Sequence, residues 1–196
     1  MSAHDALVLA AGGSLRLGQS KQLLRSGGET LIRRAVRLVL ATLPRRTLVV
    51  LGAQSDVLVR EIAGFDVETT CNSDWREGIA SSLRRAHEVL GVCDAPVLVV
   101  GVDQLRLTAD HLYALLELAR CEGEAATAYA GVFGLPAVIA ADTFARSGEL
   151  RGDLGFRALW RANGRVPGLV DAPELAFDLD TPQALREAVA AGLVDA

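Results

Sequence analysis

Short apolar runs alternate along the chain with longer segments in which apolar residues recur every three or four positions. Strands are predicted at residues 6–10, 46–52, 65–70 and 95–101. Helices are predicted at residues 30–43, 54–63, 77–90 and 109–120. Such alternation predicts an α/β fold, in which a largely parallel sheet carries helices on both faces and binds ligands at the carboxyl ends of its strands.

The alternation is less regular in the second half of the chain. Short strands are predicted at residues 125–131 and 135–140, a helix at 153–161, and a late strand at 175–180, LAFDLD. A last helix is predicted from Pro182, because proline suits a first helical turn. No internal repeat or linker interrupts the pattern, so we expect one domain over residues 1–196.

Composition narrows the choice of partners. Hydrophobic residues make up 51% of the 196 positions, and the formal net charge of −4 does not attract polyanions. Cys71, Cys93 and Cys121 are isolated, which predicts neither a disulfide framework nor a zinc site. No apolar stretch approaches the roughly 20 residues of a membrane span. We therefore expect a cytoplasmic protein that binds neither nucleic acid nor a membrane.

The first strand leads into a glycine-rich loop, LAAGGSLRLGQSK, at residues 9–21. Backbone N–H groups and two cations, Arg16 and Lys21, make this loop a candidate phosphate cradle. Lys21 is the one lysine among 20 basic residues. The glycine spacing fits neither G-x-G-x-x-G nor a Walker loop, which would need lysine where Gln19 stands. On composition alone, a solvated loop with two surface cations is an equal alternative.

A longer pattern separates these alternatives. L-A-A-G-x-S-x-R-x-G-x-x-K resembles the signature of the MobA-like NTP transferases, and later stretches match in order: CNSDWREGIASSLRRA, VLVVGVDQLRLT, AYAGVFGLPAVI, GDLGFRALW and DLDTPQAL. The L-A-A-G form is most similar to the molybdenum cofactor cytidylyltransferases, since guanylyl relatives read L-A-G-G. The resemblance implies a three-layer, Rossmann-like nucleotidyltransferase fold with a mostly parallel mixed sheet. It also implies transfer of CMP from CTP to the phosphate of molybdopterin, with release of pyrophosphate.

The resemblance also implies roles for residues of the matching motifs. The implied catalytic residues are Arg16, Lys21 and Asp103. The implied ligands of a divalent ion, Mg²⁺ or alternatively Mn²⁺, are Asp103 and Asp180. The residues implied to bind the nucleotide are Leu9, Ala10, Ala11, Gly12, Gly13, Ser14, Gly18, Lys21, Gly78, Ser81 and Ser82. Those implied to bind the acceptor are Gly134, Pro136 and Asp153.

Each assignment competes with an ordinary structural role. Asp103 and Asp180 follow or end predicted strands, where carboxylates can meet at one sheet edge. Asp180 or Thr181 would otherwise cap the helix at Pro182, and this helix entry is the favoured interpretation of Asp178. Ser81 and Asp153 could likewise be helix N-caps.

One position departs from the family pattern D-Q-P-L, because Leu105 stands where proline is expected. A freer backbone would loosen the loop that carries Asp103. This keeps open a non-catalytic alternative, a nucleotide or pterin carrier that serves a molybdenum enzyme or its maturation. Within the same reaction class, the alternatives are a GTP-using enzyme and an enzyme for sugar or isoprenoid-precursor phosphates. No histidine falls in a motif, which suits a phosphate acceptor that is already anionic near pH 7.

Overall fold

The computed structural model describes residues 3–129 and 131–196. Its strands are β1 (Asp5–Ala10), β2 (Arg25–Ser26), β3 (Glu29–Thr30), β4 (Thr47–Leu51), β5 (Glu68–Cys71), β6 (Val97–Gly101), β7 (Ala125–Tyr129), β8 (Val132–Ile139) and β9 (Gly168–Asp171). Its α-helices are α1 (Leu31–Leu40), α2 (Ser55–Glu61), α3 (Ile79–Leu90), α4 (Ala109–Glu122), α5 (Ala141–Ala145), α6 (Phe156–Ala162) and α7 (Pro182–Ala190). Short 3₁₀ turns cover Lys21–Leu23, Trp75–Glu77, Arg146–Glu149 and Pro173–Ala176.

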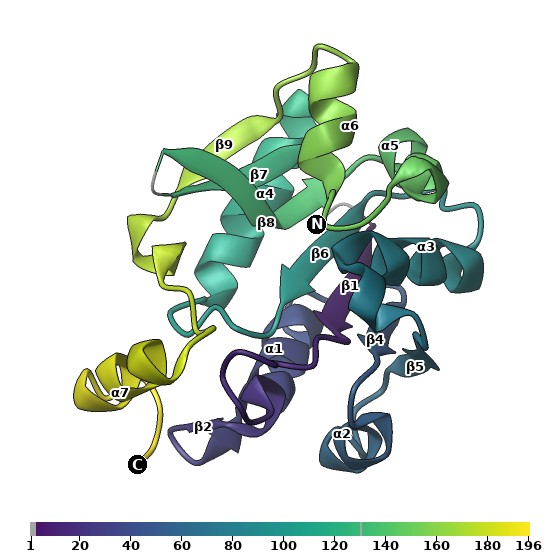
Figure 1. Ribbon diagram of the computed structural model, residues 1–196. Coiled ribbons are helices and arrows are strands. Elements are labelled where there is room, and N and C mark those ends of the chain that lie inside the picture. The colour runs from purple at the N-terminus through teal and green to yellow at the C-terminus, as the bar shows by residue number, and fades with distance from the viewer. Residues whose placement is uncertain (1–2, 130) are drawn as a thin grey trace.

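Seven strands form one sheet in the order β5-β4-β1-β6-β8-β7-β9 (Figure 1). Strand β1 pairs in parallel with β4 and β6, and the outer pairs β4–β5 and β7–β9 are parallel too. Only β8, among the described strands of this sheet, runs against its neighbours. The predicted α/β fold with a mostly parallel mixed sheet is confirmed.

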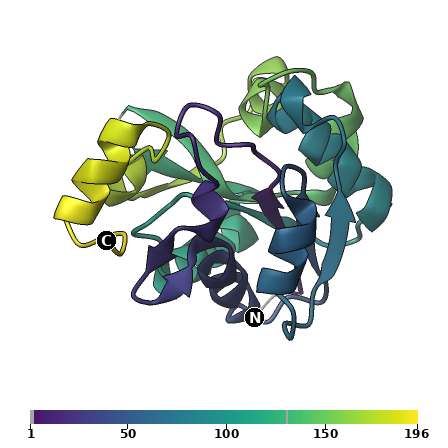
Figure 2. The same ribbon diagram turned by 60° about the horizontal axis from the view of Figure 1, so that its bottom comes forward.

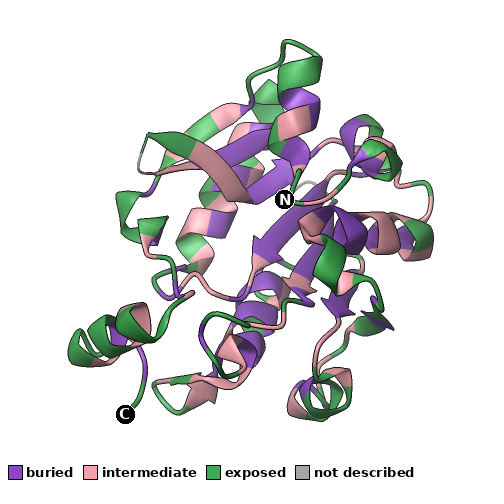
Figure 3. Cartoon of the chain, viewed as in Figure 1, coloured by how far each residue is buried: buried purple, intermediate pink, exposed green. Residues whose placement is uncertain are grey.

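Apolar clusters lie on both faces of this sheet, because successive residues of a strand point to opposite sides. Val8 and Val100 pack in one cluster with helices α1, α2 and α4. Leu7 and Val99 pack in the other with α3, α5 and α6. The purple central strands in Figure 3 are these doubly covered ones. The carboxyl ends of β1 and β6 are thereby held rigidly side by side.

A third and smaller apolar cluster lies beyond the end of the sheet. It consists of Leu31, Leu105, Leu179, Ala188 and Val194. In Figures 1 and 2 helix α7 stands apart from the sheet, with the C-terminus beside the β2–β3 hairpin. Within residues 3–129 and 131–196, no helix has both the length and the apolar character needed to cross a bilayer.

The predicted late strand at residues 175–180 is wrong. The segment begins as the 3₁₀ turn Pro173–Ala176 and continues as irregular chain. Its alternating apolar residues do not share one face, because Leu175 packs in the first cluster whereas Phe177 and Leu179 pack in the third. The strand that completes the sheet is β9, a short edge strand that the hydrophobic pattern did not indicate. The predicted strand at 125–131 corresponds to β7, and residue 130 lies outside the described residues.

Candidate active site

A cleft of about 860 Å³ opens where β1 and β6 end. Residues predicted for the site that line it are Leu9, Ala10, Ala11, Gly12, Gly13, Ser14, Arg16, Lys21, Gly78, Ser82, Asp103, Asp153 and Asp180. The structure therefore brings most of the predicted nucleotide, metal and catalytic residues together around one cavity. Gly18, Ser81, Gly134 and Pro136 are not among its lining residues.

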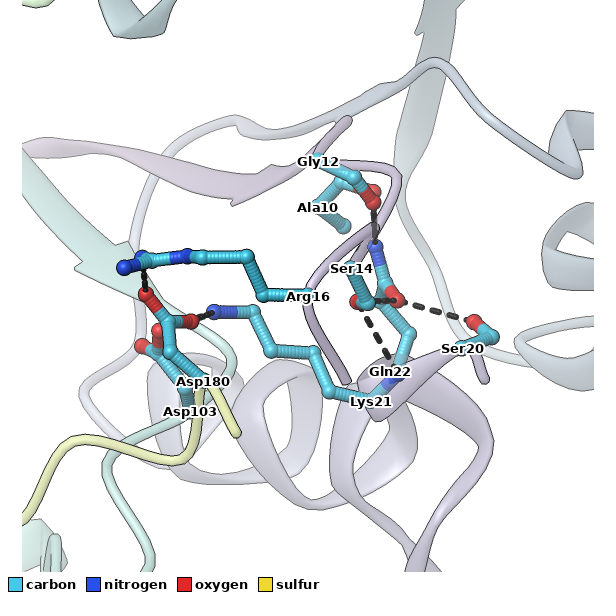
Figure 4. A network of polar contacts seen from close by, with 9 residues as sticks. All are labelled: Ala10, Gly12, Ser14, Arg16, Ser20, Lys21, Gln22, Asp103 and Asp180. Carbon is cyan, nitrogen blue, oxygen red and sulfur yellow. Dashed lines mark hydrogen bonds and ion pairs between the residues drawn. The ribbon is translucent and has the colours of Figure 1, made fainter. Parts of the chain in front are cut away.

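Gln22 braces the glycine-rich loop from inside (Figure 4). Its side chain is buried, and Nε2 donates to the carbonyl oxygens of Ala10 at 3.0 Å and Gly12 at 2.6 Å. Its Oε1 accepts from the hydroxyl of Ser20 at 2.8 Å. The Ser14 hydroxyl accepts from the backbone N–H of Lys21 at 3.1 Å, which closes the loop on itself. These hydrogen bonds hold the loop in one closed conformation, because leaving the buried amide of Gln22 unpaired would cost free energy.

Gly13 lies directly over the indole of Trp75. A Cβ atom at this position would come within 2.5 Å of ring atoms, so no larger residue fits without moving the ring. The guanidinium group of Arg76 also lies over the Trp75 ring, with its central carbon 4.3 Å from the ring centroid. This stack forms one wall of the cleft.

Lys21 joins the loop to two carboxylates from distant parts of the chain. Its Nζ donates to Asp103 at 2.6 Å and to Asp180 at 2.9 Å, and Arg16 pairs with Asp180 as well (Figure 4). Burial lowers the pKa of Lys21, but the charge of Asp103 and the hydrogen bonds to both carboxylates outweigh it, so the pKa is raised overall. Lys21 therefore stays a cation at neutral pH.

Three carboxylates meet at this point: Asp103, Asp178 and Asp180. Each offers an oxygen, and these oxygens lie within 4.8 Å of one another. Burial and the neighbouring charges of Asp180 and Asp103 raise the pKa of Asp178. Burial opposes ionisation of Asp180, but the bond and charge of Lys21 lower its pKa overall. Such a set of hard oxygen donors fits a divalent cation such as Mg²⁺ or Mn²⁺.

The helix entry that competed for these acids belongs to Thr181. Its hydroxyl accepts from the backbone N–H of Ala184 at 3.1 Å, so Thr181 is the N-cap of α7. Asp178 and Asp180 lie beside Asp103, and of these three residues Asp103 and Asp180 line the cleft. Thr181 thus makes the predicted helix entry, and Asp178 is an additional candidate metal ligand beside the predicted pair Asp103 and Asp180.

The loop after β6 is held firmly despite the missing proline. Arg34 of α1 donates to the carbonyl oxygens of Gln104 at 3.3 Å and Leu107 at 2.6 Å. The side-chain amide of Gln104 donates to the carbonyl oxygen of Leu135 in β8 at 2.7 Å. Leu105 is buried in the third apolar cluster. These contacts correct the expectation that Leu105 loosens the position of Asp103.

At the other end of the cleft, Asn72 fixes two serines of α3. Its Nδ2 donates to Ser81 Oγ at 2.8 Å and to Ser82 Oγ at 3.0 Å. Ser81 is buried and donates back to the carbonyl of Gly78, so it does not cap α3, whose N-cap is Gly78 itself. Ser82 lines the cleft.

A second, apolar cavity of about 140 Å³ adjoins this end. Its walls include Phe133, Phe156 and Trp160, and it shares Ile79, Leu135 and Asp153 with the main cleft. Of the predicted acceptor residues, Gly134 and Asp153 line it, whereas Pro136 is buried in β8 and lines neither cavity. Asp153 is not a helix cap, since the N-cap of α6 is Gly155.

The two cavities meet where Gly78 packs against the 152–153 loop. A Cβ atom at Gly78 would lie 2.4 Å from a carboxylate oxygen of Asp153, and φ is +118° there. Glycine is therefore required at this contact.

Sequence reasoning missed several residues that build the site, namely Gln22, Arg34 and Gln104. Arg34 and Gln104 carry no signal of their own, because each acts on carbonyl groups far away in the chain. Gln22 left one weak signal, a polar residue directly before the apolar pair Leu23–Leu24.

Comparisons with known proteins agree with this geometry. The family model described as MobA-like NTP transferase domain matches residues 6–166. Purine catabolism protein PucB of Bacillus subtilis (strain 168) is 30% identical over 190 residues, which cover 89% of this chain and 90% of PucB.

Solved structures show the same fold. A homologue of Rv0371c from Mycobacterium sp. strain JC1 has a TM-score of 0.82 at 24% identity, over 97% of this chain and 96% of that one. The 2-C-methyl-D-erythritol 4-phosphate cytidylyltransferase of Thermus thermophilus has a TM-score of 0.69 at 22% identity, over 98% and 99%. Molybdopterin-guanine dinucleotide biosynthesis protein A of Archaeoglobus fulgidus has a TM-score of 0.64 at 17% identity, over 94% and 96%.

Proposed function

The chain belongs to the MobA-like NTP transferase domain family, and on that premise we propose that it transfers CMP from CTP to the terminal phosphate of a molybdopterin-type acceptor in the cytoplasm, releasing pyrophosphate. One observation carries the proposal. Two cations of the glycine-rich loop and three carboxylates converge at the cleft where β1 and β6 end. This is the charge arrangement that transfer between phosphates requires.

In the proposed reaction, an oxygen of the acceptor phosphate attacks the α-phosphorus of CTP. A new phosphoanhydride bond forms as the bond from the α-phosphorus to the α–β bridging oxygen breaks, and pyrophosphate leaves with that oxygen and its charge. Arg16 and Lys21 would bind the β- and γ-phosphates and stabilise the departing group. Asp103, Asp178 and Asp180 would hold Mg²⁺ or Mn²⁺, which when bound supplies further positive charge at the phosphate oxygens.

No general base is needed if the acceptor is a phosphate. All three histidines lie among the described residues and none lines the cleft. A phosphate monoester already carries negative charge near neutral pH, so catalysis reduces to alignment and charge neutralisation. An alcohol acceptor would need a proton acceptor that the histidines do not provide.

The choice of base and acceptor rests on the L-A-A-G sequence and on the end of the cleft near Gly78. The L-A-A-G sequence resembles cytidylyl enzymes, and Ser82 offers its hydroxyl beside Gly78. The adjoining cavity, walled by Phe133, Phe156 and Trp160, suits a flat ring system better than a sugar or a short polyol phosphate.

Pyrophosphate release tests the proposal. The protein is incubated with Mg²⁺, molybdopterin and each of the four nucleoside triphosphates, and CTP is then made to compete with GTP. We expect release with CTP and little competition by GTP. Preference for GTP would overturn the base assignment, and release only with a sugar or erythritol phosphate would overturn the acceptor. Tight nucleotide binding without release for any pair would favour the carrier.

A further inference from the structure

The third apolar cluster touches the segments that carry Lys21, Asp103, Asp178 and Asp180. Leu105 is two residues from Asp103, and Leu179 lies between Asp178 and Asp180; both are buried in this cluster. Leu24, at the end of the 3₁₀ turn that begins with Lys21, packs against the same cluster. The cluster therefore joins three loops that are remote in sequence but adjacent in the cleft.

The carboxylates of the C-terminal segment have no sheet to fix them. The C-terminal segment is residues 177–195. Its first part, residues 177–181, forms neither strand nor helix, and the family model ends at residue 166, before the segment begins. In place of a β-ladder, the segment is anchored at both ends. Leu179 is fully buried at one end, and α7 contributes Ala188 at the other.

A polar lock closes the far end of the segment. The carboxylate of Asp195 accepts hydrogen bonds from the backbone N–H groups of Gly27 at 2.8 Å and Gly28 at 2.7 Å, in the β2–β3 turn. The Asp195 N–H donates to the carbonyl oxygen of Arg25 at 2.8 Å. Val194, next to Asp195, is buried in the third cluster. Figure 2 shows this end of the chain beside the hairpin.

We infer that residues 177–195 act as a docked segment that sets the positions of Asp178 and Asp180, and that Leu105 and Leu179 are positioning residues, which align the three carboxylates through their shared apolar contact. The inference rests on the proposed function for its catalytic meaning. The coupling between the segment and the loop after β6 is a physical claim of its own. Residues that hold metal ligands in place are worth roughly 10–100-fold in metal affinity, so the effect is measurable.

The experiment uses the whole chain with Leu105→Ala and Leu179→Ala. Leu90→Ala is the matched control, because Leu90 is as buried as Leu105 but packs in the cluster around α3, α5 and α6, on the other face of the sheet from Leu107. Mn²⁺ binding without nucleotide is titrated by electron paramagnetic resonance. We expect both test variants to bind Mn²⁺ roughly 10–100-fold more weakly than wild type, and the control to bind it as wild type does. Leu105→Met, which keeps the volume, should restore the affinity.

Hydrogen exchange by mass spectrometry supplies a readout that needs neither metal nor activity. Leu179→Ala should speed amide exchange at residues 104–107, and Leu105→Ala should speed exchange in α7, whereas Leu90→Ala should do neither. Asp195→Ala should speed exchange in α7, with Asp66→Ala as the control for loss of a surface acid.

The outcomes separate the inference from the proposed function. Unchanged exchange in the partner segment, or equal loss of Mn²⁺ affinity in Leu90→Ala, overturns the inference. If the two variants show the reciprocal exchange effects but the wild-type protein transfers no nucleotide, the inference is supported and the proposed function is contradicted.

Discussion

At the scale of single residues, one ammonium group connects the charged residues of the candidate site. Lys21 is mostly shielded from solvent and contacts Asp103 and Asp180 at once, whereas the Arg16 side chain is 73% exposed and pairs with Asp180 alone. A shielded, fixed charge acts more strongly on a phosphate than a solvated one does. The two cations should therefore contribute unequally.

We expect Lys21→Ala to lower kcat by about 10²–10³-fold, as removal of a preorganised charge does. Arg16→Ala should cost less. Steady-state pyrophosphate release measures both, and far-UV circular dichroism verifies the fold. Arg120→Ala, an exposed arginine paired with Glu117, is the control. Full activity in Lys21→Ala would remove this residue from the mechanism.

The second prediction at this scale concerns Gln22. Gln22→Ala leaves the carbonyl oxygens of Ala10 and Gly12 without their donor, so the free energy of unfolding should fall by about 1–3 kcal/mol. The KM for nucleotide should rise because the loop loses its brace. Urea unfolding and nucleotide titrations measure the two effects. Ser20→Ala removes one of the two hydroxyl donors to Oε1, leaves both carbonyl contacts in place, and should change both quantities less; an equal change would argue against this role.

Much of the site could be predicted from motifs, and the rest depends on contacts that a motif does not contain. Asp103 and Lys21 belong to short patterns with fixed spacing. Asp178 was interpreted as part of a helix start, which Thr181 and Pro182 do form, and its place beside Asp103 and Asp180 depends on packing that no motif contains. Gln104 gave no signal, since its partner Leu135 lies 31 residues away.

At the scale of elements, α4 is tied to the sheet by a polar chain beneath the acceptor side. Thr127 of β7 donates to the carbonyl oxygen of Pro136 at 2.7 Å, so its oxygen accepts from His111 Nε2 at 2.8 Å. Burial lowers the pKa of His111, against a smaller opposing effect from the charge of Glu174. The folded protein thus favours the neutral imidazole.

This gives a pH-dependent stability with a definite sign. Above the ordinary histidine pKa of about 6.5 the contribution of His111 to stability is complete. As the pH falls below that value, the unfolded chain takes up the proton first, and stability is lost until the lower folded-state pKa is passed. Urea unfolding at pH 7.5 and 5.5 should show a larger loss for wild type than for His111→Gln. Identical losses would contradict the prediction.

Elements with a strong hydrophobic period could be predicted from the sequence, whereas the strand at the edge of the sheet, β9, could not. Strand β6 is fully covered on both faces and reads as an unbroken apolar run. Strand β9 covers four residues at the sheet edge and exposes Leu169, so its sequence carries no clear period. LAFDLD alternates as a strand would, yet its apolar side chains serve two different clusters.

At the scale of the whole molecule, we propose that the three apolar clusters belong to one folded domain. The two tryptophans report from different parts of it: Trp160 is buried in the second cluster, and Trp75 lies in the cleft wall. A single domain of this size should unfold in one cooperative step.

Urea unfolding tests this proposal. In Trp75→Phe and in Trp160→Phe, the fluorescence midpoint should coincide with the far-UV circular dichroism midpoint of the same variant. Comparing probes within one variant removes the effect of the substitution on stability. A cleft tryptophan that reports an earlier transition than the backbone would indicate two separately folding parts.

A cation at the acidic cluster would connect the end of β6 to the C-terminal segment. Mn²⁺ should therefore raise the melting temperature of the wild-type protein, with about 2.7 kcal/mol of added stability at 100 times the Kd. Asp103→Asn should abolish this shift, and EDTA should reverse it. Differential scanning calorimetry measures it. A shift that survives in Asp103→Asn would mean that the ion binds elsewhere.

The single lysine has a practical consequence. Apart from the α-amino group, the chain carries one primary amine, and that amine faces the cleft. Reductive methylation with ¹³C-formaldehyde would label this one side-chain amine, because the side chains of the other basic residues, the arginines, do not react. The single NMR resonance of this label would then report when Lys21 exchanges its carboxylate partners for the phosphates of a bound nucleotide.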